Sequence, residues 1–174
     1  MIAVVKCVKR HQCGYSRAIP RELDTYLKDH YAGSAGGTGL CRRIAEGASG
    51  DAEQREVNDI AEAIEADQAT LEEIMSRIGV SPSRFKAVGA WIGEKGSRLK
   101  LRSSSEAGRV FQYEAMIMGV TGKLQLWHSL LEIGPQVPEF RQPELEELKG
   151  RAADQQARLQ KLHDTAAGNL SADR

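Results

Sequence analysis

The sequence predicts an all-α protein built as a bundle of four long helices. Apolar residues recur at alternating steps of three and four in four separate stretches, which is the spacing of a buried helix face. Gly, Ser and Pro clusters separate these stretches. The only apolar run that suits a strand, at residues 2–8, has no second strand to pair with.

Length and composition predict one folded domain without a strong overall charge. At 174 residues the chain can bury a substantial core, and its 24 basic and 24 acidic residues balance. We therefore expect no nucleic-acid partner. No apolar run approaches the ~20 residues of a membrane helix, and the apolar start ends at Lys6, too early for a signal peptide. These features predict a cytoplasmic protein with no membrane partner, whose three cysteines stay thiols.

The N-terminal half predicts a leader followed by a helical hairpin. Residues 1–19 are basic without a helical period and are expected to form a flexible leader. Pro20 suits a first helical turn, so a helix is predicted over 21–45. After the break at 47–50, Asp51 is a natural N-cap for a second helix that ends near Gly79.

The C-terminal half predicts three more helical segments. Ser81 and Pro82 open a middle segment that is broken by glycines. Ser104 or Ser105 caps the most apolar helix of the chain, which runs to about Ile133. Such a helix is either central or covered by a partner, and we expect a homodimer through it. Pro143 begins the last helix; the domain is expected to span 20–168, and 169–174 to fray.

The order of these segments predicts their topology. A helix of ~20 residues spans ~30 Å, so the middle segment is long enough to return along the bundle. The second pair of helices then begins at the end where the first pair turns. This is a four-helix bundle with one long helical crossover.

An ionisable residue interrupts each apolar row of the first hairpin. The rows contain His30 and Asp67 where aliphatic residues are expected. Residues equidistant from the turn of an antiparallel hairpin lie at the same height, which pairs His30 with Asp67 inside the protein. Either the two form a buried polar pair that fixes the helix register, or the carboxylate orients the imidazole towards a metal or ligand.

Several segments resemble the ferritin-like superfamily, in particular small bacterial proteins with Asp-His-x-x-Gly in the first helix. They are residues 29–33 (DHYAG), 64–67 (IEAD), 91–101 (WIGEKGSRLKL) and 114–127 (EAMIMGVTGKLQLW). The resemblance implies a ferritin-like bundle with a crossover helix. Di-iron members of the superfamily carry Glu-x-x-His on two helices. That motif occurs nowhere here, because Val8, Leu27, Gln125 and Gln160 precede the four histidines by three positions.

A partial metal site therefore has three candidate ligands: His30, Asp67 and Glu114. They are donors for iron, manganese or zinc, although for Glu114 a salt bridge to a basic neighbour is the stronger expectation. Gln155 and Gln156 are expected to close a polar core layer with Thr121 and Asp67, because an amide is a weak metal ligand. Two function classes follow: a non-catalytic bundle that acts through protein association, or a metal- or small-ligand-binding bundle without a complete catalytic centre.

Overall fold

The computed structural model describes residues 19–81 and 105–171. Within these ranges the chain forms four long helices, α1 (Arg21–Glu46), α2 (Asp51–Arg77), α4 (Glu106–Ile133) and α5 (Gln142–Asn169), and the short 3-10 helix η1 (Gly134–Gln136). The four long helices pack against one another, which confirms the predicted all-α bundle. The predictions for the leader, for the middle segment and for Cys7 and Cys13 lie outside the described residues.

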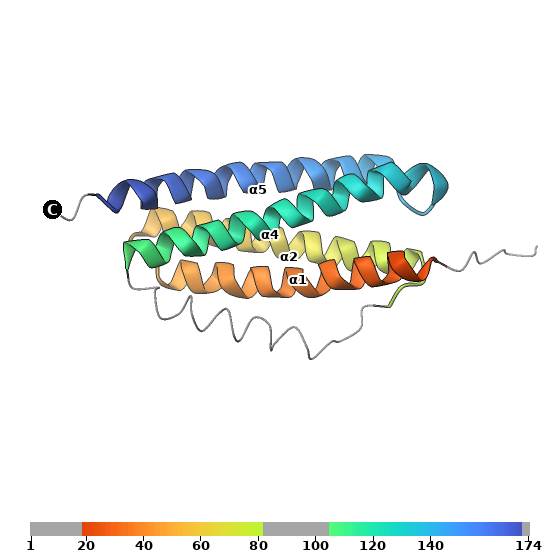
Figure 1. Ribbon diagram of the computed structural model, residues 1–174, viewed down its shortest axis with the longest axis horizontal. Coiled ribbons are helices and arrows are strands. Elements are labelled where there is room, and N and C mark those ends of the chain that lie inside the picture. The colour runs from red at the N-terminus through yellow and green to blue at the C-terminus, as the bar shows by residue number, and fades with distance from the viewer. Residues whose placement is uncertain (1–18, 82–104, 172–174) are drawn as a thin grey trace, which may run out of the picture.

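The helices form two antiparallel hairpins, α1 with α2 and α4 with α5 (Figure 1). Helix α4 begins at the end of the bundle where α1 turns into α2, as the sequence predicted. Arg109 in its first turn donates a hydrogen bond to the carbonyl of Gly47 at 3.1 Å. Whether a crossover helix joins the two hairpins lies outside the described residues.

Local signals at the helix ends explain most of the boundaries. The Ser105 hydroxyl caps α4 by accepting a hydrogen bond from the Gly108 amide at 3.0 Å. Asp51 lies in the first turn of α2 and Gly50 at the N-cap, so the predicted cap is off by one residue. Gly79, which directly follows the C-cap of α2, has a φ of 77°. This left-handed conformation favours glycine and ends the helix.

Two apolar clusters fill the bundle, one towards each end. Leu27, Leu71 and Leu130 belong to the cluster near the α4–α5 turn, and Cys41 and Ile60 to the cluster near the α1–α2 turn. Helices α2 and α5 contact each other at few residues, and two ion pairs connect them. The Arg158 guanidinium lies 2.6 Å from the Glu56 carboxylate, and Arg77 pairs with Glu144.

Helix α4 packs against both α1 and α5, which bury its main apolar row within one chain. Ile117 and Leu124 beside this row are partly exposed. Met118 is 69% exposed and is the most exposed large apolar residue in the described ranges. No helix within these ranges is long and apolar enough to span a bilayer.

Truncating a central core residue tests this packing. Leu130 is 0% exposed, so Leu130→Ala removes buried methyl groups and leaves a cavity, which should lower the free energy of unfolding by about 2–5 kcal/mol. Leu170 is 51% exposed, and Leu170→Ala should change stability by less than about 0.5 kcal/mol. Urea unfolding followed by circular dichroism measures both, and equal losses would contradict the assigned core.

Candidate functional site

A buried carboxylate lies between the two apolar clusters. Asp67 on α2 is 1% exposed, and it occupies the core-facing row of its helix between Ile64 and Leu71. A carboxylate in such a place is costly unless other groups neutralise and bond it. Its neighbours therefore determine what this layer can do.

Three side chains from α4 and α5 surround Asp67. The Lys123 ammonium donates to Oδ2 at 2.7 Å, and the Gln155 amide donates to the same oxygen at 3.0 Å. Arg151 lies 2.8 Å from Oδ1 as an ion pair. Lys123 also donates to the Gln155 amide oxygen. We call these four residues the polar layer.

Burial lowers the pKa of Lys123 from its ordinary value, and the adjacent Asp67 carboxylate opposes this shift. Arg151 adds a second positive charge that disfavours the ammonium. The polar layer thus contains two cations for one carboxylate. The Asp67 carboxylate is neutralised by the protein's own side chains.

The amide part of the polar layer was predicted and the lysine was not. The expected hydrogen bond between Gln155 and Asp67 is confirmed. Thr121 accepts a hydrogen bond from Gln156 at 2.7 Å, as this layer predicted. The signal for the lysine was in the row of α4: steps of three and four from Val120 pass through Lys123 to Trp127.

The structure does not pair His30 with Asp67. Among the described residues no hydrogen bond or ion pair joins them, and the His30 ring packs edge-on against Tyr26 with centroids 4.6 Å apart. Burial lowers the pKa of His30, and Asp29 opposes that shift. Counting residues from the turn gives the height of each residue along the hairpin, but it does not give the direction of its side chain. The Asp67 side chain points towards α4 and α5 and not towards α1.

Glu114 has a different neighbour from either His30 or Asp67. Its side chain is 46% exposed, and its carboxylate is 3.7 Å from the His163 imidazole of α5. His30, Asp67 and Glu114 are therefore not gathered into one site. In the described ranges no group of three or more His, Cys, Asp and Glu side chains is arranged to hold a metal ion.

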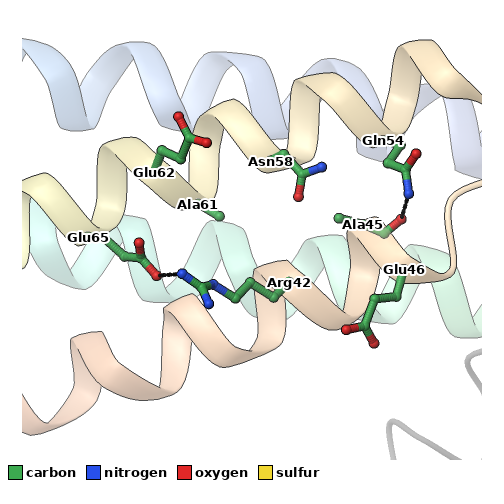
Figure 2. Close-up of a pocket in the computed structure, with 8 residues that line it drawn as sticks. All are labelled: Arg42, Ala45, Glu46, Gln54, Asn58, Ala61, Glu62 and Glu65. Carbon is green, nitrogen blue, oxygen red and sulfur yellow. Dashed lines mark hydrogen bonds and ion pairs between the residues drawn. The ribbon is translucent and has the colours of Figure 1, made fainter.

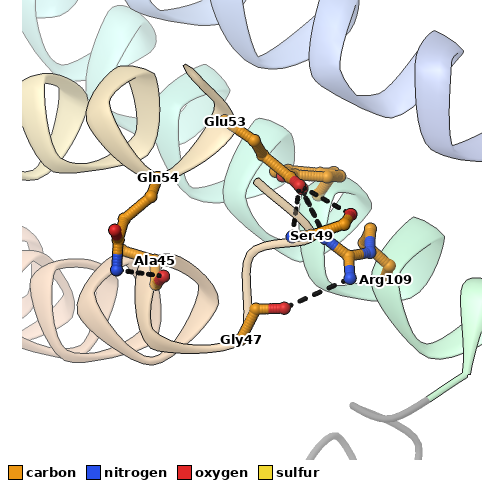
Figure 3. A network of polar contacts seen from close by, with 7 residues as sticks. Ala45, Gly47, Ser49, Glu53, Gln54 and Arg109 are labelled. Atoms are coloured by element: carbon orange, nitrogen blue, oxygen red, sulfur yellow. Dashed lines mark hydrogen bonds and ion pairs between the residues drawn. The ribbon is translucent and has the colours of Figure 1, made fainter. Parts of the chain in front are cut away.

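A second polar network ties the α1–α2 turn to α4 (Figure 3). Glu53 receives hydrogen bonds from the Ser49 amide and hydroxyl, both at 2.9 Å, and from Arg109 at 2.6 and 2.8 Å. The Tyr113 hydroxyl also donates to it. Burial alone would raise the pKa of Glu53, but these donors outweigh it and hold the pKa below its ordinary value.

A polar groove of about 370 Å³ lies between α1 and α2 (Figure 2). Arg42 reaches across it to Glu65, while Gln54 donates to the carbonyl of Ala45 at 3.3 Å. Glu46 and Glu62 line the groove as well, so carboxylates outnumber the single guanidinium. The groove is open, and its single guanidinium is already paired with Glu65.

Cys41 is completely buried beside the polar layer. Its thiol donates to the carbonyl of Val57 at 3.5 Å. Burial raises its pKa to about 12, although Lys123 opposes the shift. A buried thiol with a raised pKa is a poor nucleophile, since the thiolate is the nucleophilic form.

Comparison with known proteins adds no relative. No protein-family model, curated protein or solved structure matches the chain. The function of the protein is therefore inferred from the geometry of the described residues.

Removing the lysine of the polar layer should leave the Oδ2 oxygen of Asp67 with only the neutral Gln155 amide as a donor, because Arg151 pairs with Oδ1 and is itself 39% exposed. We expect Lys123→Met to lower the free energy of unfolding by about 3–5 kcal/mol. The double variant Lys123→Met/Asp67→Leu should recover most of that loss, because it removes the buried Asp67 carboxylate as well as its Lys123 partner. Denaturant unfolding gives both values. A double variant no more stable than the single one would contradict this account of the layer.

The Glu53 network predicts a pH dependence of stability. Because the folded-state pKa of Glu53 lies below the ordinary value of 4.5, its contribution is complete above pH 4.5. The contribution is lost as the pH falls through the folded-state pKa. Glu53→Gln should therefore be less stable than the wild type at pH 7, and the gap should narrow towards pH 3.

Unfolding free energies across this pH range provide the measurement. Glu73→Gln is the matched control, since Glu73 is an exposed carboxylate on the same helix, α2. Its variant should follow the wild-type curve. A gap between Glu53→Gln and the wild type that does not change with pH would refute the role of the ionised carboxylate.

Proposed function

We propose that this chain is a non-catalytic helical bundle of ferritin-like architecture that acts through protein association. The observation that supports the non-catalytic part is the polar layer, in which Asp67 pairs with Lys123 and Arg151 although its Oδ1 oxygen accepts no hydrogen bond from the described residues. Metal-binding bundles direct carboxylates inwards to hold an ion. Here the inward carboxylate of Asp67 lies 2.7 Å from the Lys123 ammonium and 2.8 Å from Arg151.

The electrostatics of this layer disfavour a dication. A metal bound to Asp67 would face two positive charges, one of them on a lysine that is itself largely buried. Both cations would have to move away for the carboxylate to become a ligand. The layer is therefore better suited to fixing the bundle than to holding a substrate.

The helix arrangement supports the ferritin-like part of the proposal. Two antiparallel hairpins pack together, and the second begins at the end where the first one turns (Figure 1). A long connection between the hairpins is the arrangement that the resemblance implies. Protein association is the activity left for such a bundle once its core is filled.

Metal analysis distinguishes this proposal from the metal-binding class. The purified full-length protein, prepared without chelators, should contain far less than one equivalent of iron, manganese or zinc. His30→Ala should leave the metal content unchanged, because the ring packs on Tyr26. Elemental analysis of both proteins measures this. A stoichiometric metal that is lost in His30→Ala would overturn the proposal in favour of a metal site.

A further inference from the structure

We draw no further inference here: the strongest candidate, the groove of about 580 Å³ between α4 and α5 that Leu124, His128 and Gly150 line, carries none, because nothing in the described part of the chain shows what covers it.

Discussion

The charge of Asp67 is the constraint on which the rest of the bundle depends. A carboxylate that is 1% exposed has to be neutralised inside the protein, and its neutralising groups come from α4 and α5. Helix α2 can therefore pack against the second hairpin at only one height. Apolar clusters above and below the layer tolerate small shifts, whereas a displaced ion pair leaves an uncompensated charge.

The Glu53 network fixes the same alignment from the other side. It joins the α1–α2 turn to the first turns of α4 through Arg109 and Tyr113. Two polar ties at different heights, one at the turn and one at mid-bundle, define both the register and the direction of the second hairpin. Hydrogen bonds to charged groups are directional, which an apolar core alone is not.

The interior and the outer surface of the bundle differ in polarity. At the centre, the Asp67 carboxylate is paired with Lys123 and Arg151. The outer surface differs between the two hairpins. The groove on α1 and α2 is polar and crossed by the Arg42–Glu65 pair, while the groove on α4 and α5 has an apolar floor and small residues.

The sequence by itself determined the helices, their order and the residues that lie inside. Periodicity and local capping groups, such as Ser105, depend on neighbours along the chain, so they could be recognised without a structure. It also placed Asp67 and Gln155 in the core and correctly predicted their hydrogen bond. The same periodicity contained Lys123, but its spacing alone did not identify it as the partner of Asp67.

Only the tertiary structure decided which neighbouring helices the Asp67 side chain faces and therefore which cations it contacts. Counting residues from a turn gives a height along a helix, but the direction of a side chain depends on how four helices are rotated about their axes. That rotation is set by the packing of all core residues together. For this reason His30 was matched with Asp67 by height, while the folded chain brings Lys123 and Arg151 to the carboxylate.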